Sequence, residues 1–291
     1  MDLCLTGPAE LRRGREWGAQ RLPGETCYEL FAVLYARNAH RTSGRSFLFD
    51  KTGDPHDTPM PMDYFVWGAR SAERTVVVDM GFTEETARRR KHEFFRCPSE
   101  GLRLVGIDPA EVDDVIITHM HWDHVGNFDK FPNARFHIQQ LELNYVTGTD
   151  TYWKGFKGGV LVEDVCALIR TNYDERVVFH DGEGHIAPGV SVHFVGGHTK
   201  GQQIARIHTK RGWVVVASDA AHYYANIDER NPFPAVYNVG DNLISFDTAR
   251  ALAASPRHII PGHDPLVMKR YAAPSPELEG IAVQLDTEPL G

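Results

Sequence analysis

The sequence predicts an α/β protein made of one domain. Apolar segments with strand-like composition end in, or lead directly into, a His or Asp at residues 112–118, 190–198, 213–219 and 258–263. Stretches of helical composition separate them, as in α/β folds, which hold functional side chains on loops at strand ends. The chain has no internal repeat or Gly/Ser linker that would divide it, so residues 1–291 are expected to form a single domain.

The first predicted elements are a strand and a hairpin. Residues 28–37 (YELFAVLYAR) have the composition of a strand, and a segment rich in turn-forming residues follows as far as Met62. We expect that segment to run over the surface. Residues 63–69 and 74–81 flank a polar turn, which is the pattern of a β-hairpin. The second strand of this hairpin is apolar throughout, so it is predicted to lie in the centre of a sheet.

Helical and strand-like segments alternate in the middle of the chain. Residues 84–96 have helical composition, and residues 107–111 (IDPAE) have the pattern of a cap and first turn leading into strand 112–118. A partly apolar helical stretch at residues 156–173 interrupts the later strands. We expect this stretch to cover the functional site.

The composition is that of an ordinary globular protein with a small-molecule partner. Hydrophobic residues make up 42% of the chain and charged residues 24%. The net charge of −8 argues against nucleic acid as a partner, because nucleic-acid affinity rests mainly on Lys and Arg. A small, neutral or modestly charged substrate fits better. The basic run at residues 88–91 is interpreted as a solvated helix face.

Neither a membrane segment nor a disulfide framework is expected. No stretch approaches the roughly 18 apolar residues that span a bilayer, and the first residues lack a signal-peptide pattern, so a cytoplasmic location is expected. Cys4, Cys27, Cys97 and Cys166 are widely spaced and contain no C-x-x-C pair. We therefore interpret all four as free thiols.

The strongest functional signal is an H-x-H-x-D-H motif directly after strand 112–118. In extended chain, side chains two positions apart point the same way, so His119 and His121 can reach one cation together. Asp123 and His124 fall where the chain turns, into a helix expected to begin near Val125, and so they face a second point. Imidazole and carboxylate groups suit Zn, Mn, Fe and Co, and the motif therefore predicts a metal site.

Further motifs extend this pattern to a known family. Asp79 in VVVDMG, residues 119–124, His198 in GGHTKGQQ, Asp219 in ASDAA and His263 in IPGHD appear in this order. The set resembles the five ordered motifs of the metallo-β-lactamase superfamily. Within it, the order is similar to that of the N-acyl-homoserine lactonases, where an aspartate rather than a cysteine occupies the fourth motif.

The resemblance implies a four-layered αββα sandwich, with two divalent metal ions at one edge. Zn is the expected metal, with Fe, Co or Mn as alternatives. Asp219 would bridge the two metals, and Asp79 would support the loop that carries the first histidines. The remaining implied ligands are His119, His121 and His198 for the first metal and Asp123, His124 and His263 for the second.

The resemblance also implies a reaction. Two divalent cations about 3.5–4 Å apart can share a water, lower its pKa and deliver hydroxide to a carbonyl, here that of a small lactone or ester. Lactonases of the resembled group carry a Tyr three positions after the bridging Asp, where it stabilises the developing oxyanion. This chain has His222 at that position and Tyr223 directly after it. Asp123, His222 and Tyr223 are therefore the predicted catalytic residues.

Other activities stay open at this point. Thioester, β-lactam, phosphotriester and arylsulfate hydrolysis use the same metals, and a mononuclear-iron persulfide dioxygenase uses a similar scaffold. A non-catalytic metal-binding module is a third class. Dimers are common in the resembled group, so a homodimer is expected, with contacts from the segments before Met62 and around residues 150–175.

Overall fold

A computed structural model describes residues 26–49 and 57–290 of the chain. The first 25 residues lie outside the described residues. They include Cys4 and the segment in which no signal peptide is expected. Part of the predicted surface segment before Met62, at residues 50–56, also lies outside the described residues. Cys27, Cys97 and Cys166 are free thiols, as expected.

The first sheet is mixed and, within the described ranges, has eight strands. Its order is β13-β1-β2-β3-β5-β6-β7, and β4 pairs with β1. The neighbours from β13 to β3 are antiparallel, and β3, β5, β6 and β7 run parallel. The strands are β1 (Glu29–Asn38), β2 (Met62–Arg70), β3 (Thr75–Val78), β4 (Glu93–Phe94), β5 (Asp114–Ile116), β6 (Arg135–Gln139), β7 (Val177–His180) and β13 (Ala282–Gln284).

Among the residues that the structure describes, the second sheet has five strands in the order β12-β11-β10-β9-β8. Its pairs are antiparallel except for β11 and β12, which run parallel. The strands are β8 (Glu183–Ala187), β9 (Val190–Phe194), β10 (Gln203–Thr209), β11 (Gly212–Ser218) and β12 (Ile259–Pro261).

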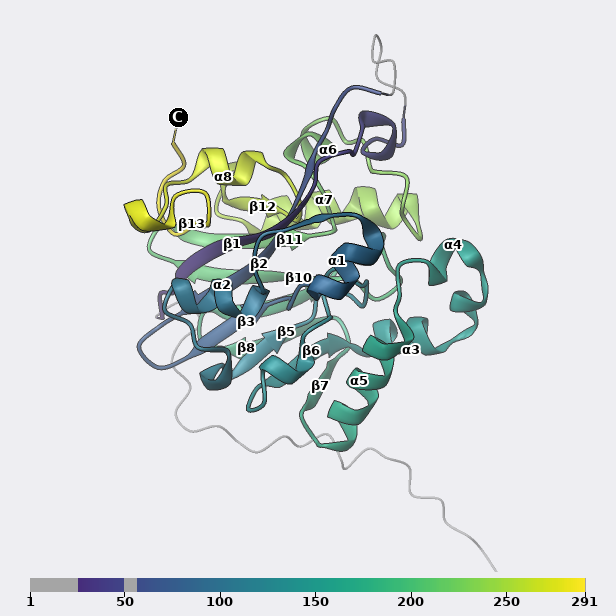
Figure 1. Cartoon of the computed structure of the whole chain (residues 1–291), viewed down its shortest axis with the longest axis horizontal. Helices are drawn as coiled ribbons and strands as arrows, with labels where there is room; N and C mark the ends of the chain where they lie inside the picture. The colour runs from purple at the N-terminus through teal and green to yellow at the C-terminus, as the bar shows by residue number, and fades with distance from the viewer. Residues whose placement is uncertain (1–25, 50–56, 291) are drawn as a thin grey trace, which may run out of the picture.

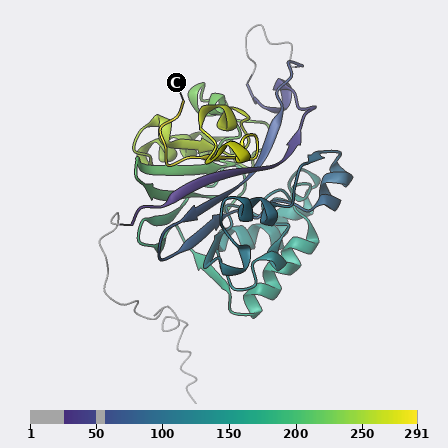
Figure 2. The same cartoon turned by 60° about the vertical axis from the view of Figure 1, so that its left-hand side comes forward.

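Helices cover the outer face of each sheet, and Figures 1 and 2 show α1 to α5 on one side of the strands and α6 to α8 on the other. The α-helices are α1 (Glu84–Arg90), α2 (Pro98–Leu104), α3 (Gln140–Thr147), α4 (Lys154–Lys157), α5 (Val162–Tyr173), α6 (Tyr224–Asp228), α7 (Val239–Leu252) and α8 (Leu266–Arg270). Short 3-10 turns are η1 (Ser43–Arg45), η2 (Pro109–Glu111), η3 (Phe128–Lys130), η4 (Thr149–Tyr152), η5 (Pro256–His258) and η6 (Pro276–Leu278).

Three buried clusters correspond to the three interfaces of a four-layered sandwich. The first joins the outer face of the larger sheet to its helices, for example Val115 with Leu102 of α2. The second lies between the sheets and includes Trp67 and Val216, and the third packs α7 on the smaller sheet through Phe246. Alternating strand residues point to opposite faces, so one strand contributes to two of these clusters. The predicted αββα architecture is confirmed.

Several predicted elements occur where the sequence places them. The hairpin is β2 and β3, and β3 lies between β2 and β5 in the sheet, as its apolar sequence predicts. The turn at η2 begins with Asp108, whose carboxylate accepts a hydrogen bond from the Ala110 N–H. The strand that follows is shorter than residues 112–118, because regular pairing is confined to β5.

Two helix predictions are wrong, one in the extent of the helix and one in its existence. The helix predicted at residues 84–96 ends at Arg90, since Lys91 takes a left-handed conformation (φ 60°) and the next residues pair as β4 with β1. No helix begins at Val125, which instead forms a bridge with Gly81. The Gly126 N–H donates to the Gly81 carbonyl over 2.7 Å, and this contact with a distant segment of the chain replaces the first helical turn.

The stretch at residues 156–173 forms α4 and α5, separated by a link that contains Gly158 and Gly159. This link lies beside the metal motif, because the Trp122 N–H donates to the Gly159 carbonyl over 2.8 Å. Arg90 is not purely a solvated residue, since its guanidinium stacks 3.8 Å from the centre of the Trp122 ring. Within the described ranges, no helix is long and apolar enough to cross a bilayer.

Candidate metal centre

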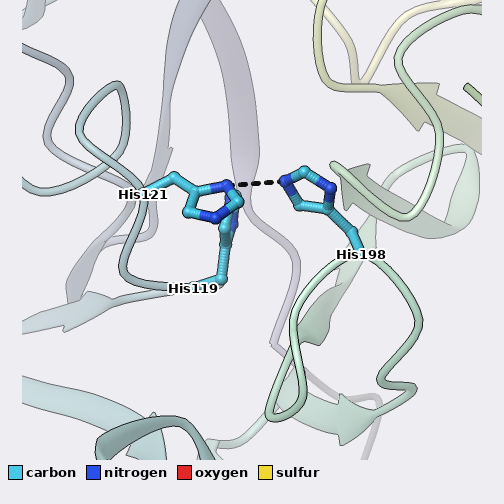
Figure 3. A group of neighbouring side chains, drawn as sticks. All are labelled: His119, His121 and His198. Atoms are coloured by element: carbon cyan, nitrogen blue, oxygen red, sulfur yellow. Dashed lines mark hydrogen bonds between the residues drawn. The ribbon is translucent and has the colours of Figure 1, made fainter. Parts of the chain in front are cut away.

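Three histidines meet at one edge of the sandwich. His119 and His121 lie on the loop after β5, and His198 comes from the loop after β9 on the other sheet (Figure 3). His121 Nδ1 lies 2.8 Å from His198 Nε2, and one nitrogen from each of the three rings lies within 4.8 Å of the others. The two loops thus bring together side chains that are 77 positions apart.

Asp123, His124, Asp219 and His263 form a second cluster, whose ligand-type atoms also lie within 4.8 Å of one another. His124 Nε2 is 3.7 Å from Asp123 Oδ2, and His263 Nε2 is 3.8 Å from the same oxygen. His263 follows β12 and Asp219 follows β11, so parallel neighbours in the smaller sheet deliver both groups to the same edge.

Asp219 lies between the two clusters and offers one oxygen to each. Its Oδ1 is 2.8 Å from His263 Nε2 and 3.5 Å from His124 Nε2. Its Oδ2 is 3.4 Å from His198 Nε2 and 3.9 Å from His119 Nε2. A carboxylate placed in this way can bind two cations at once.

The polar atoms at the centre fit a pair of metal ions. Within the described part of the chain, Nε2 of His119, His124 and His263 and Oδ1 of Asp219 are buried without a hydrogen bond. Buried polar atoms without partners are costly, and an ion is one of the few explanations for several of them in one place. Imidazole nitrogen and carboxylate oxygen are the donors that zinc and similar divalent metals prefer.

The opposite ring nitrogens are held by the protein. His198 Nδ1 donates to the Ala235 carbonyl over 2.6 Å, and His263 Nδ1 donates to the Asp63 carbonyl over 2.8 Å. A proton on Nδ1 leaves the Nε2 lone pair directed at the cluster, an arrangement that is common among metal-binding histidines.

Asp79 joins three parts of the centre. Its carboxylate lies 2.7 Å from His124 Nδ1, and it accepts hydrogen bonds from the Thr118 N–H over 2.8 Å and from the Ser218 hydroxyl over 3.1 Å. Thr118 precedes His119, and Ser218 precedes Asp219. Asp79 is fully buried and adopts a left-handed backbone conformation (φ 58°), which is uncommon for a residue with a side chain.

Burial and charge favour the metal-binding form of four of these groups. Burial lowers the pKa of His119, His121 and His198, which favours the neutral imidazole that a metal needs. Burial tends to raise the pKa of Asp219, but the surrounding imidazoles, led by that of His263, outweigh it and hold the pKa well below the usual range. Asp219 is therefore a carboxylate.

Glu142 is a buried residue at this centre that the sequence motifs do not reveal. It accepts hydrogen bonds from the Met120 N–H over 2.9 Å, the Thr199 hydroxyl over 2.8 Å and the Gly201 N–H over 2.9 Å. Burial raises its pKa to about 7 and outweighs these hydrogen bonds, which act to lower it. A single acidic residue between Leu141 and Leu143 carries no spacing that would have identified it.

His222 and Tyr223 point in different directions. His222 Nε2 lies 3.0 Å from Asp219 Oδ2, and its ring stacks on Phe233 with the ring centres 3.3 Å apart. The Tyr223 hydroxyl donates to the Met60 carbonyl over 3.2 Å, on the side of the segment before β2. The structure thus brings His222 to the cluster and directs the Tyr223 hydroxyl to backbone carbonyls.

Aromatic side chains are candidates for the walls of a pocket at this centre, and the ring of Phe233 lies 5.1 Å from that of His198. Trp67 and Phe128 belong to the buried core, and Trp153 is 63% exposed. His193 on β9 is buried, and its Nε2 lies 2.9 Å from the Ser191 hydroxyl.

The sandwich and its two His/Asp clusters define a class of proteins that bind metals at the edge of two packed sheets. The family model of the metallo-β-lactamase superfamily matches residues 61–263, and the chain belongs to this superfamily. All seven clustered residues lie within the matched range.

Curated relatives of the chain include N-acyl homoserine lactonases. One from Bacillus cereus is 29% identical over 133 residues, which are 45% of this chain and 48% of that protein. One from Azorhizobium caulinodans is 27% identical over 173 residues, which are 56% of this chain and 62% of that protein. The chain therefore spans about half to three fifths of the length of these relatives.

Solved structures with the same fold include enzymes of this kind. A quorum-quenching N-acyl homoserine lactone lactonase superposes with a TM-score of 0.67 at 19% identity, covering 82% of this chain and 93% of that one. A dizinc quorum-quenching lactonase with its product gives a TM-score of 0.62 at 17% identity, covering 84% of this chain and 89% of that one. At these identities the likeness shows the fold.

Proposed function

We propose that this chain is a dinuclear metal-dependent hydrolase that opens a small lactone resembling an N-acyl-homoserine lactone. The observation that carries the proposal is the position of Asp219, whose two oxygens face two separate clusters of imidazoles. A site of this kind suits hydrolysis without a nucleophilic Ser or Cys. The lactonase activity of the curated relatives supports the choice of substrate.

Under this proposal His119, His121 and His198 hold the first metal, Asp123, His124 and His263 hold the second, and Asp219 bridges them. Zn is the proposed metal, and Fe, Co or Mn are compatible with the same donors. When bound, two such cations supply a hydroxide nucleophile at neutral pH and polarise the carbonyl under attack.

His222 is the proposed donor to the carbonyl oxygen of the lactone, which gains charge as the carbonyl is attacked. Its Nδ1 lies 3.4 Å from the Arg41 guanidinium, which can only donate, so Nδ1 accepts and the ring proton is held on Nε2. The Nε2–H group faces the cluster at Asp219 Oδ2. Burial lowers the pKa of His222, which keeps it a neutral donor, and the stacked Phe233 ring fixes its plane.

The substrate would reach the centre at Asp123 and His121. The Asp123 side chain is 12% exposed, whereas the side chains of His119 and His124 are at most 2% exposed. Gly159 packs directly against the His121 ring, where a larger residue would overlap it. The link between α4 and α5 thus covers one side of the His121 ring.

Elemental analysis of the purified protein, coupled to a panel of lactone, thioester, β-lactam, phosphotriester and arylsulfate substrates, tests this function. We expect about two equivalents of metal and the highest kcat/KM on an acyl-homoserine lactone, measured as acid release. Removal of the metals with a chelator should abolish turnover, and divalent metal should restore it. A preference for a thioester, or a single iron with oxygen uptake on a persulfide, would refute the lactonase proposal.

A further inference from the structure

The loops that carry the first three histidines belong to different sheets, and the Glu142 carboxylate contacts both loops. Glu142 lies on α3, is completely buried, and accepts hydrogen bonds through Oε1 from the Met120 N–H and through Oε2 from Thr199 and Gly201. Met120 lies between His119 and His121. Thr199 and Gly201 follow His198, so each carboxylate oxygen holds one of the two loops.

The backbone of α3 also packs closely against the second loop. A Cβ atom at Gly201 would overlap the backbone of Glu142, so only glycine allows this approach. Farther from the ligands, the Gln203 side chain donates to the carbonyls of Ile117 and His137 over 2.8 and 3.0 Å. Glu142 therefore bridges the two ligand loops by hydrogen bonds, at positions next to the histidines themselves.

We propose that Glu142 is a positioning residue that sets the spacing of His119, His121 and His198 and so prepares the first metal site. This inference rests on the proposed two-metal function. Three N–H and O–H donors converge on the carboxylate, and only a group with two acceptor oxygens can satisfy all of them. A glutamine has one such oxygen, so in either orientation its NH₂ group faces a backbone N–H.

The effect is specific to one of the two clusters. His124 and His263 are held from behind by Asp79 and by the Asp63 carbonyl, and neither group depends on Glu142. Loss of this bridge should thus loosen the first metal while the second keeps its supports. Partners that orient metal ligands typically change metal affinity by about 10- to 100-fold.

The test compares Glu142→Gln with wild type and with Asp114→Asn. Asp114 offers a matched control because it is also a fully buried carboxylate with three partners, Arg74, Arg135 and His137, at the opposite end of β5. The dissociation constants of both metals are measured by competition with a chromophoric chelator. The visible spectrum of the cobalt-substituted protein reports ligand geometry, and urea unfolding reports stability.

We expect Glu142→Gln to bind one metal about 10- to 100-fold more weakly, to leave the other within about threefold of wild type, and to shift the cobalt spectrum. Thr199→Val, which removes one of the three hydrogen bonds, should weaken the same metal by at most about tenfold and serves if Glu142→Gln does not fold. Asp114→Asn should lower stability without changing either affinity.

Unchanged affinities in a folded Glu142→Gln protein would overturn the inference, as would equal weakening of both metals. An affinity loss equal to that of Asp114→Asn at matched stability would overturn it too. Wild-type protein that binds no metal would instead refute the proposed function, so the two failures are distinguishable.

Discussion

Replacing Asp79 with Asn should weaken metal binding by removing support for the ligands, without removing a ligand itself. The carboxylate is fully buried, lies 2.7 Å from His124 Nδ1, and accepts hydrogen bonds from Thr118 and Ser218. Asparagine fills the same space but has one acceptor oxygen and an NH₂ group. One of the N–H or O–H donors around position 79 would therefore face another donor.

The magnitude follows from the bond that is lost. A hydrogen bond to a charged group contributes about 1.5–3 kcal/mol, and about 1.4 kcal/mol corresponds to a tenfold change in a binding constant. The second metal, which His124 is proposed to bind, should thus be held about 10- to 100-fold more weakly. The first metal should be affected less, because His198 and His121 do not contact Asp79.

The metal affinity of the Asp79→Asn protein is measured by chelator competition. Its kcat is measured both at saturating and at limiting metal concentration. We expect kcat to recover largely when metal is in excess, because all seven proposed ligands remain. Asp114→Asn again controls for the loss of a buried charge. Wild-type affinity for both metals, or a loss of kcat that excess metal cannot restore, would refute the supporting role of Asp79.

Three further predictions concern the centre and the stability of the fold. Asp219→Ala should abolish hydrolysis and reduce bound metal below two equivalents by elemental analysis; full activity with two equivalents would contradict the bridging role. His222→Ala should lower kcat by about 10²–10³-fold, whereas Tyr223→Phe, which removes a hydroxyl bound to the Met60 carbonyl, should leave kcat nearly unchanged; the reverse order in steady-state kinetics would exclude His222 as the donor. Burial, followed by the nearby Glu163, raises the pKa of Asp164 to about 7. Between about pH 4 and 7, Asp164 therefore keeps its proton in the folded state and loses it in the unfolded state. The free energy of unfolding thus falls as the pH rises through this window. Asp164→Asn should therefore raise the free energy of unfolding by about 1 kcal/mol at pH 8 and change it little at pH 4; equal effects at both pH values in urea denaturation would argue against this.

Much of the metal centre follows from local spacing. His119 and His121 point the same way because they are two positions apart in extended chain, and the structure brings both to the cluster with His198. Asp123 and His124 lie at the turn and join the other cluster, as their position after the strand predicts. The ordered motifs led to the αββα fold, since residues 61–263 carry the family pattern.

Other features depend on residues that no local pattern connects. The helix predicted to reach residue 96 ends at Arg90, because pairing of β4 with β1 outweighs helical propensity. Arg90 stacks on the Trp122 ring of the metal loop and is only partly exposed, and His193 is buried on its strand. These outcomes are decided by which surfaces meet when the layers pack.

The sequence by itself therefore determined the alternation of strands and helices, the family and the residues able to bind metal, because these depend on residue type and on spacing along the chain. Only the tertiary structure decided that each oxygen of Asp219 faces a different cluster, that Arg41 meets His222, and that Glu142 ties two loops together. Such contacts join segments 22 to 181 positions apart, and they form only when both sheets and their helices have packed.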